Sequence, residues 1–586
     1  MKKTRIQKLS RWRVIIACWV LLSLSLLTPG CLSGDYGSPY YGRVVVPRQQ
    51  EFRWSDGGLP QVFDPALAAV PPDTDVVRAL FEGLTDYDPQ TLKPTPGVAE
   101  RWESSNDGRV WTFYLRDEAR WSTGEPVTAG DFVRSWERTL RLGDLAPHTD
   151  LLSNIVGARA YMGAVKAGAQ PATGPSQAAN RNNEGTRSET PRRSDTRLVG
   201  AEEIDTHVLR VHLQRPNTNF PALVAHPVFR PIKIRDQNES MKVSAPNLIS
   251  NGAFLLARSE SDMVLLQRAE NYWGKAEVNL QRVEFVKTRD AESALAAYVA
   301  GDIDAVTNAP FEPLALKLLA VYADYRRNTY AALTYYSFNM SREPFNDVRV
   351  REALAIAIDR ERISEDEMGG ATEPANTFLP VINEVDNSES VIAKSGTLNK
   401  DQSRAKQLLA DAGFPNGDGF PVIRLLINRN EQQRQVAQAV ASSWRNILNV
   451  ETEIIAKPWD EYEASIRAGE YDLARRGAVM QSADEASNIR MLFPMEGKGA
   501  DSSTTGAQPG ATATVNQGNT LSDKTRLAPI ESEADALRRL TAIPIYFASS
   551  YSLVKPYVSG FDSNILDAPS LKNVKIDSAW QEPKSR

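Results

Sequence analysis

Residues 121–132 read WSTGEPVTAGDF, a turn that leads directly into the first residues of a helix. Thr128 can cap this helix with its side-chain oxygen, and Asp131 falls at the third helical position, close to the positive end of the helix dipole. Apolar side chains then recur on one side at helical spacing, at Phe132, Val133, Trp136 and Leu140. The stretch therefore predicts an amphipathic helix that packs against a core.

Strands and helices are expected on both sides of this helix. Residues 110–115 (VWTFYL) follow the turn at 106–108 and read as a strand, as do residues 206–213 and 450–455. Further helices are expected at residues 348–358, 406–412, 432–448 and 534–540. A mixture of this kind in 586 residues predicts an α/β protein with more than one core.

A series of short motifs runs through the chain. The motifs lie at residues 63–65 (FDP), 80–84 (LFEGL), 96–103 (PGVAERWE), 111–116 (WTFYLR), 121–132, 250–254 (SNGAF), 271–273 (NYW), 301–304 (GDID), 344–351 (PFNDVRVR), 405–414 (AKQLLADAGF) and 553–556 (LVKP). In this order they resemble the family-5 extracellular solute-binding proteins, the oligopeptide- and dipeptide-binding receptors of ABC importers. Most of these residues are interpreted as turn, cap or core positions, so they identify the fold without forming its site.

The resemblance implies a periplasmic-binding-protein-like (type II) clamp of two jaws with an additional third lobe. Lobe I is expected at residues 45–81, 202–330 and 554–586, lobe II at 82–201, and lobe III at 331–553. The implied function is that of the substrate-binding component of an ABC peptide importer. It would bind short peptides between the lobes and deliver them to permease and ATPase subunits.

Site residues follow from the resemblance position by position. Val70, Arg78 and His148 match positions near the cleft of the oligopeptide-binding relatives. Residues 471–481 (YDLARRGAVMQ) resemble the segment that lines the cleft, where Gly477 and Val479 would offer main-chain hydrogen bonds. Arg475 belongs to the same segment.

The chain departs from the family pattern at Gln481, where relatives have an aspartate that pairs with the ligand's amino group. An amide is a weaker acceptor for an ammonium than a carboxylate. Either Asp484 or Glu485 replaces that aspartate, or the ligand needs no free ammonium. The alternative function is a receptor of the same fold for a metal chelate, an opine or a cell-wall peptide, or a relative with a sensory or structural role.

The first residues predict export. A basic segment with Lys2, Lys3 and Arg5 precedes an apolar run over 14–27, which has the length of a signal-peptide core rather than of a membrane span. The run ends before Cys31, and residues 27–31 (LTPGC) resemble a bacterial lipobox. We therefore expect a signal peptide at 1–30, lipid attachment at Cys31, a tether at 31–44, and a location in the periplasm or on the outside of the cytoplasmic membrane.

Two segments have a different composition from the rest. Residues 167–195 and 497–519 are rich in small and polar residues and nearly free of large apolar ones. They bury too little surface to offset the entropy of ordering, which predicts mobile insertions in lobes II and III.

Composition argues against several other functions. Net charge is −5 with mixed signs, so no basic face for nucleic acid is expected. Cys18 and Cys31 are the two cysteines and only four histidines occur, so we expect no metal site and no cofactor. No GxSxG elbow, nucleophile–base set or phosphate-binding loop can be recognised, so no catalytic residue and no enzyme activity are expected.

Overall fold

The computed structural model of the chain describes residues 39–166, 200–234, 248–381, 397–494 and 529–582. Outside these residues lie the predicted signal peptide, Cys31, the first part of the tether and both predicted insertions.

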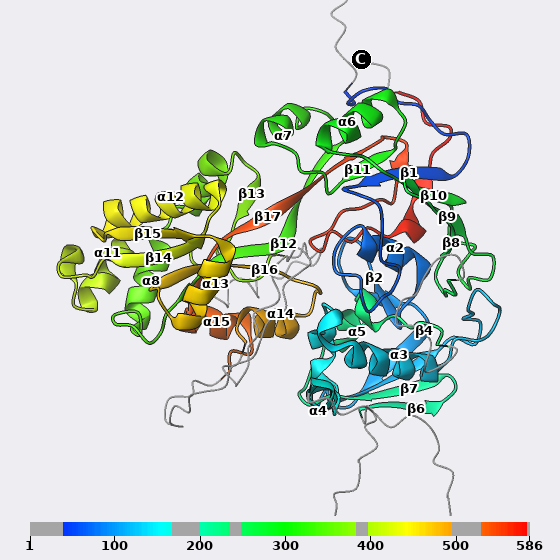
Figure 1. Ribbon diagram of the computed structural model, residues 1–586, viewed down its shortest axis with the longest axis horizontal. Coiled ribbons are helices and arrows are strands. Elements are labelled where there is room, and N and C mark those ends of the chain that lie inside the picture. The colour runs from blue at the N-terminus through cyan, green and yellow to red at the C-terminus, as the bar shows by residue number, and fades with distance from the viewer. Residues whose placement is uncertain (1–38, 167–199, 235–247, 382–396, 495–528, 583–586) are drawn as a thin grey trace, which may run out of the picture.

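Two long strands, β12 (Tyr325–Phe338) and β17 (Ala542–Val554), run antiparallel through the middle of the molecule (Figure 1). They join two groups of strands into one sheet of eleven strands within the described residues. The other strands are β15 (Thr452–Lys457), β14 (Ile423–Asn428), β16 (Leu473–Val479), β11 (Ala305–Thr307), β1 (Glu51–Asp56), β10 (Arg282–Val286), β9 (Met263–Arg268), β8 (Phe254–Ser259) and β13 (Thr372–Pro374). Strand order is β15-β14-β16-β12-β17-β11-β1-β10-β9-β8, with β13 on β17.

A separate four-stranded antiparallel sheet has the order β4-β5-β7-β6. Its strands are β4 (Ala99–Ser104), β5 (Val110–Leu115), β7 (Val208–His212) and β6 (Ala201–Asp205). Strand β7 therefore pairs with β5, and β6 pairs with β7. The sequence-based division assigns residues 202–330, which include β7 and most of β6, to lobe I. Two strand pairs complete the sheets: β2 (Thr85–Tyr87) with β3 (Pro94–Pro96), and β18 (Val558–Ser559) with β19 (Lys575–Ile576).

The helix predicted at residues 128–140 is confirmed as α3 (Ala129–Leu142). Thr128 and Asp131 form a reciprocal capping box, in which each side chain accepts from the other residue's backbone N–H. Phe132, Trp136 and Leu140 are fully buried against the four-stranded sheet and its neighbours. The expected strand at 110–115 is β5, whose side chains alternate between buried and half-buried.

Helices cover the sheets on several sides (Figure 1). The remaining α-helices are α2 (Asp73–Leu80), α4 (Ala158–Lys166), α5 (Phe220–Leu223), α6 (Ala291–Ala300), α7 (Pro313–Leu319), α8 (Val348–Ile356), α9 (Arg360–Arg362), α11 (Gln402–Asp411), α12 (Glu431–Leu448), α13 (Trp459–Ala468), α14 (Glu485–Leu492) and α15 (Glu533–Arg539). The helices expected at 348–358, 406–412, 432–448 and 534–540 correspond to α8, α11, α12 and α15.

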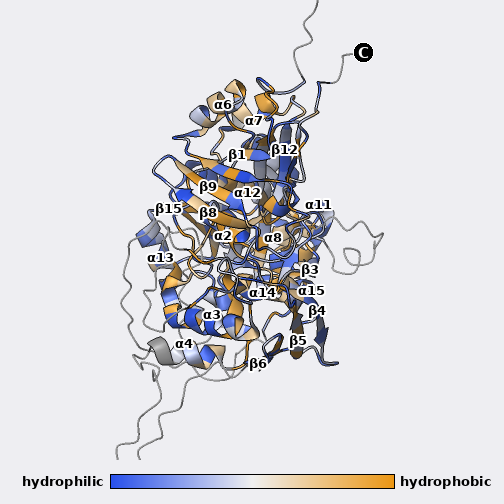
Figure 2. Cartoon of the chain, turned by 90° about the vertical axis from the view of Figure 1, so that its right-hand side faces the viewer, coloured by the Kyte–Doolittle hydropathy of each residue, from blue (hydrophilic) through white to orange (hydrophobic). Residues whose placement is uncertain are grey.

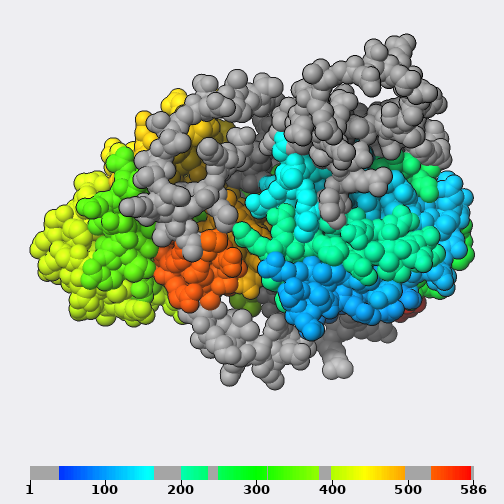
Figure 3. Space-filling view, turned by 90° about the horizontal axis from the view of Figure 1, so that it is seen from below, coloured from blue at the N-terminus to red at the C-terminus, as the bar shows by residue number. Residues whose placement is uncertain are grey.

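Apolar side chains gather in two large cores. One lies around β1, α2, α3 and the four-stranded sheet, and the other around β12, α8, α12 and β14. Figure 2 shows apolar and polar residues interleaved along the strands and helices. Seen from below, the part coloured cyan to blue and the part coloured yellow to orange lie on two sides of a seam (Figure 3).

A set of four charges fixes the chain where α2 ends, with Glu82 and Arg230 buried and the other two half-buried. We call it the base cluster: Glu82, Asp86, Arg230 and Lys572. Lys572 Nζ lies 2.6 Å from Asp86 Oδ2 and 3.3 Å from Glu82 Oε1, and Arg230 Nη2 lies 3.2 Å from Asp86 Oδ1. Two carboxylates and two cations from three distant segments thus satisfy one another.

Candidate functional site

A small cavity lies where the two parts meet. It has a volume of about 20 Å³, room for about one water molecule. The loop before α2 and α2 itself, the middle of β12, the end of β16 and the turn at 564–568 all contribute to it. The lining residues are Ala69, Val70, Pro71, Thr74, Arg78, Tyr330, Met480, Gln481 and Leu566.

Helix α2 positions Arg78, the one cationic side chain among these lining residues. Asp73 and Asp75 in its first turn favour the helix through their interaction with the positive end of its dipole. Arg78 Nη1 donates to Asp75 Oδ1 at 2.8 Å, one turn back along the helix. Arg78 Nε is buried and has no hydrogen-bond partner within the described residues, so the guanidinium retains donor capacity.

Two further carboxyl groups lie near Arg78, and we call the four residues Asp56, Asp75, Arg78 and Asp567 the cleft cluster. Asp56 ends β1 and accepts from Thr307 Oγ1 at 2.7 Å. Burial raises the pKa of Asp56 and Asp75, which share a hydrogen bond, and the Asp56 charge raises the pKa of Asp75 further. Burial and the Asp56 charge raise the pKa of Asp567 to about 7. Three carboxyl groups therefore face one guanidinium.

A pair of histidines lies beside Arg78. The rings of His148 and His226 meet edge to face at 4.9 Å, and His148 Nε2 lies 2.9 Å from the carbonyl oxygen of Ala69. Burial lowers the pKa of both rings, and that of His226 well below its usual range. His226 also hydrogen-bonds the Gln481 side chain. A neutral polar contact thus links the 226–228 turn to the end of β16.

Strand β16 presents a free edge next to the cavity. Met480 N donates to Ala331 O at 2.8 Å, so the main chain of even-numbered residues faces β12. Gly477 and Val479 alternate with them and point their N–H and C=O groups away from β12. On that side β14 pairs with only the first two residues of β16. Gln481 Nε2 donates to Val479 O at 3.2 Å. Within the described residues, the main chain of Gly477 and the N–H of Val479 are therefore available to a strand-like ligand, which would replace the Gln481 side chain at Val479 O.

The structure thus brings some of the predicted site residues together. Val70, Arg78 and Gln481 line one cavity, and His148 packs directly behind Ala69. Arg475 lies further along β16, where its Nη2 donates to Thr334 Oγ1 at 3.4 Å.

Asp484 has a structural role and does not line the cavity. Its Oδ2 accepts from Ser487 N at 2.8 Å as the N-cap of α14, and Arg490 Nη2 lies 4.0 Å from the same oxygen. Glu485 Oε1 accepts from Glu533 N at 2.9 Å, which ties α14 to α15. Asp484 and Glu485, the two alternatives for a carboxylate in place of the aspartate at position 481, each bond the protein in this way.

Other residues of the site lay outside the sequence prediction. Thr74, Tyr330 and the two aspartates at 56 and 567 come from four separate segments. Tyr330 lies at an irregularity where the β12–β17 register shifts. No local motif marks these residues, because only the tertiary fold brings them together.

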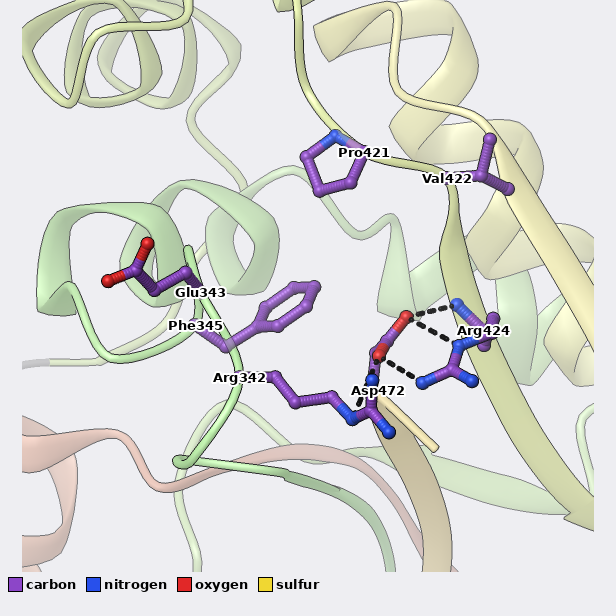
Figure 4. Close-up of a pocket in the computed structure, with 7 residues that line it drawn as sticks. All are labelled: Arg342, Glu343, Phe345, Pro421, Val422, Arg424 and Asp472. Carbon is purple, nitrogen blue, oxygen red and sulfur yellow. Dashed lines mark hydrogen bonds and ion pairs between the residues drawn. The ribbon is translucent and has the colours of Figure 1, made fainter. Parts of the chain in front are cut away.

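A larger depression lies at the outer end of β14, away from this cavity (Figure 4). It has a volume of about 390 Å³ and is open to solvent. Arg424 binds Asp472 through its backbone N–H and its guanidinium, and Arg342 Nε lies 3.7 Å from the same carboxylate. Because these charges satisfy one another on an open surface, we assign no ligand to it.

Two kinds of feature are absent from the described residues. These residues contain no group of three or more histidine, cysteine, aspartate or glutamate side chains arranged to hold a metal ion. They also contain no helix long and apolar enough to cross a membrane.

The fold and the placement of the cavity define the class of protein. A mixed α/β chain whose parts share strands and meet at a charged cavity is a type II periplasmic binding protein, as predicted. The chain belongs to the bacterial extracellular solute-binding proteins, family 5, whose middle-region model matches residues 93–500.

Individual relatives cover nearly the whole chain. The periplasmic murein peptide-binding protein MppA of Escherichia coli (strain K12) is 30% identical over 562 residues, 94% of this chain and 96% of that protein. The periplasmic oligopeptide-binding protein OppA of Salmonella typhimurium is 30% identical over 545 residues, 91% of this chain and 94% of that protein. A structure of MppA described as the unliganded open form has a TM-score of 0.69 at 27% identity and covers 91% of this chain and 98% of that one.

Proposed function

We propose that the chain is the extracytoplasmic substrate-binding component of an ABC importer and that it binds short peptides between its lobes. The observation that carries the proposal is the free edge of β16 beside the cavity. An extended peptide has one N–H and one C=O per residue. Gly477 and the N–H of Val479 offer matching groups, and a peptide N–H would take the place of Gln481 Nε2 at Val479 O. Binding through the main chain explains why peptides of varied sequence would be accepted.

Peptides methylated on single backbone nitrogens test this proposal directly. N-methylation removes one donor and blocks one strand contact without changing the side chains. In calorimetric titrations of a tetrapeptide series, we expect the affinity to fall about tenfold or more when an amide facing β16 is methylated, and to change little at the alternate amides. Equal affinity throughout the series, or no binding of any peptide, would contradict the proposal.

The ligand's amino group is expected to contribute little. Gln481 is a neutral acceptor, and Asp484 and Glu485 are occupied by their bonds to Ser487 and Glu533. We expect free and N-acetylated forms of the same peptide to differ less than about tenfold in affinity. A loss of about a hundredfold on acetylation would show instead that a carboxylate captures the ammonium.

A cell-wall peptide is the second candidate ligand. The likeness to MppA, named as a murein peptide-binding protein, supports it at the same identity as the likeness to OppA. Thermal-shift measurements with a murein tripeptide and with ordinary tripeptides at equal concentration separate the two, since the tighter ligand raises the melting temperature more.

The location and partners follow from the same proposal. Cys31 carries the lipid, residues 32–44 form the tether, and the permease and ATPase subunits of the importer receive the ligand. The lobe boundaries predicted from the sequence belong to the proposal as well, with β12 and β17 as the segments shared between lobes. Labelling with radioactive palmitate, lost in Cys31→Ala, is the expected result for the lipid, whereas an unlabelled wild type would refute it.

A further inference from the structure

Helix α7 carries apolar side chains on its outer face. Leu314, Leu318 and Val321 have 69%, 64% and 80% of their surface exposed. At 100° per residue Leu314 and Leu318 lie about 40° apart on one side of α7, and Val321 follows them in the turn after the helix ends at Leu319, so the three adjoin as one stripe. On the opposite side, Leu316 and Leu319 are buried. Because one apolar side of α7 packs on the core, its apolar outer side is left as a second surface that another molecule can contact.

This outer stripe (Leu314, Leu318 and Val321) differs from the other exposed apolar residues of the described chain. Those are mostly single, whereas here three adjoin within eight positions, beside α6 with its exposed Val299. Figure 2 shows α6 and α7 together at the top of the molecule in the colours of apolar residues. The polar residues at this place are of mixed sign, with Lys317 and Glu312 both exposed. The stripe therefore favours an apolar partner over a charged one.

The N-terminal segment enters the fold at this stripe. Ala323, two residues after Val321, donates its backbone N–H to Pro39 O at 2.8 Å. Tyr41 N donates to Asp324 Oδ1 at 2.9 Å, and Arg43 N to Val299 O at 2.9 Å. These bonds hold residues 39–43 against α6 and the end of α7.

The covalent distance to Cys31 is short. Pro39 lies eight positions after Cys31, and eight fully extended steps of the chain span at most about 28 Å. A lipid on Cys31 would keep the outer stripe within this distance of the bilayer at all times. Tethering at such a length corresponds to a local concentration on the order of millimolar, at which weak apolar contacts become populated.

We propose that the outer stripe of α7 rests on the lipid surface when the protein is anchored. This inference rests on the proposed lipid at Cys31. Leu314, Leu318 and Val321 enter the interfacial region of the bilayer, as the apolar face of a peripheral helix does. Helices α14, α15 and α4 lie toward the opposite end of the molecule (Figure 1). In this pose the seam between them faces away from the membrane, toward solutes outside.

The test uses the secreted form that starts at Cys31, whose single thiol is coupled to a maleimide phospholipid in phosphatidylcholine vesicles. Chemical coupling supplies the anchor whether or not cells acylate Cys31, so the result is independent of that part of the proposed function. Hydrogen–deuterium exchange of residues 311–323 is compared between coupled protein and free protein with the same vesicles. We expect exchange to slow about threefold or more on coupling, and to be insensitive to salt.

Two triple variants make the test specific. Leu314→Ser/Leu318→Ser/Val321→Ser is expected to abolish the slowing on coupling. Leu145→Ser/Ile204→Ser/Val422→Ser removes three exposed apolar side chains elsewhere and is expected to retain it. Unchanged exchange on coupling would overturn the proposal, as would slow exchange already in the free protein, which indicates cover by the chain itself. Slowing only in vesicles that contain the permease would assign the stripe to that protein instead.

Discussion

The base cluster and the cleft cluster are both largely buried sets of four charged residues, yet they differ in balance. In the base cluster Asp86 lies between Lys572 and Arg230, and burial, which alone would raise its pKa, is outweighed by their charges, so that the pKa falls to about 2. Hydrogen bonds from Tyr272 and Trp273 complete the shell of Glu82. Its charges are therefore balanced within the protein, although Arg230 Nε is buried without a hydrogen-bond partner in the described residues.

The cleft cluster has three carboxyl groups for one guanidinium, and burial raises the pKa of all three. Apart from the hydrogen bond that Asp56 and Asp75 share, which needs a proton on one of them, one carboxyl oxygen of each is buried without a partner in the described residues. A protein tolerates such a deficit where something else supplies the missing partner or a proton. The balanced cluster therefore stabilises the fold, whereas the unbalanced one lies beside the cavity where we propose that the ligand binds.

The largest effect is expected from breaking the balanced cluster. Asp86→Ala leaves Lys572 and Arg230 buried without their shared carboxylate, and removing one partner of a buried ion pair costs about 3–5 kcal/mol of unfolding free energy. Chemical denaturation at pH 7 measures it. Because the pKa of Asp86 is lower in the folded protein than in the unfolded chain, the stability that its ion pairs contribute is complete above about pH 4 and is lost as the pH falls through about 2.

The matched control for Asp86→Ala is Glu103→Ala, which removes an exposed partner of Arg101. An exposed pair contributes little, so the change should stay below about 1 kcal/mol. A loss below about 1 kcal/mol for Asp86→Ala as well would remove the distinction between the base cluster and a surface ion pair.

The second prediction concerns the guanidinium of the unbalanced cluster. Arg78→Gln deprives three buried carboxyl groups of their nearest cation in the cavity wall, so we expect peptide affinity to fall about ten- to a hundredfold by calorimetry. Arg78→Lys keeps the positive charge but lacks the planar guanidinium, so its loss of peptide affinity should be smaller. Unchanged affinity in Arg78→Gln would show that the ligand does not sense the cluster.

Much of the fold was predictable because its signals are local. Thr128 and Asp131 lie three residues apart, and their capping box forms as the sequence predicts. The alternation in residues 110–115 likewise determines which face of β5 is buried. The sharing of β12 and β17 between the two halves of the large sheet was not read from the sequence, since those strands pair residues more than 200 positions apart.

The candidate site was predictable only where the family resemblance supplied positions. Arg78 and Gln481 were expected near the cleft and line the cavity. Asp56 and Asp567 were missed, because a single aspartate at a strand end or in a turn is ordinary in sequence. Their raised pKa depends on burial and mutual proximity, which only the folded chain creates.

The third prediction uses pH. The pKa of Asp567 is about 7 in the folded protein, against an ordinary value of 3.8, so the folded state binds this proton more tightly than the unfolded chain. The protonated Asp567 carboxyl therefore contributes to the free energy of unfolding, and this contribution is complete below about pH 4 and is lost as the pH rises through 7. Asp567→Asn should therefore stabilise the protein at pH 8, by about 1–2 kcal/mol after allowance for partial exposure.

The backbone supports the same substitution. Asp567 has φ of 50°, a left-handed conformation that asparagine adopts readily. The difference between wild type and Asp567→Asn should vanish at pH 4 and grow toward pH 8 in thermal unfolding. A constant difference at all pH values would attribute the effect to something other than the proton on Asp567.

The smallest effect is expected from a pair of buried threonines, one beside each cluster. Thr85 Oγ1 donates to Pro221 O at 2.6 Å, whereas Thr74 Oγ1 is buried beside the cavity without a partner in the described residues. Thr85→Val should cost about 1 kcal/mol of unfolding free energy, because the carbonyl loses its donor. Thr74→Val should change the free energy by less than about 0.5 kcal/mol but weaken peptide binding severalfold if the ligand bonds that hydroxyl. Equal losses of unfolding free energy in the two variants would mean that the Thr74 hydroxyl is as firmly bonded as the Thr85 hydroxyl. The difference between the two clusters would then not extend to the uncharged residues beside them.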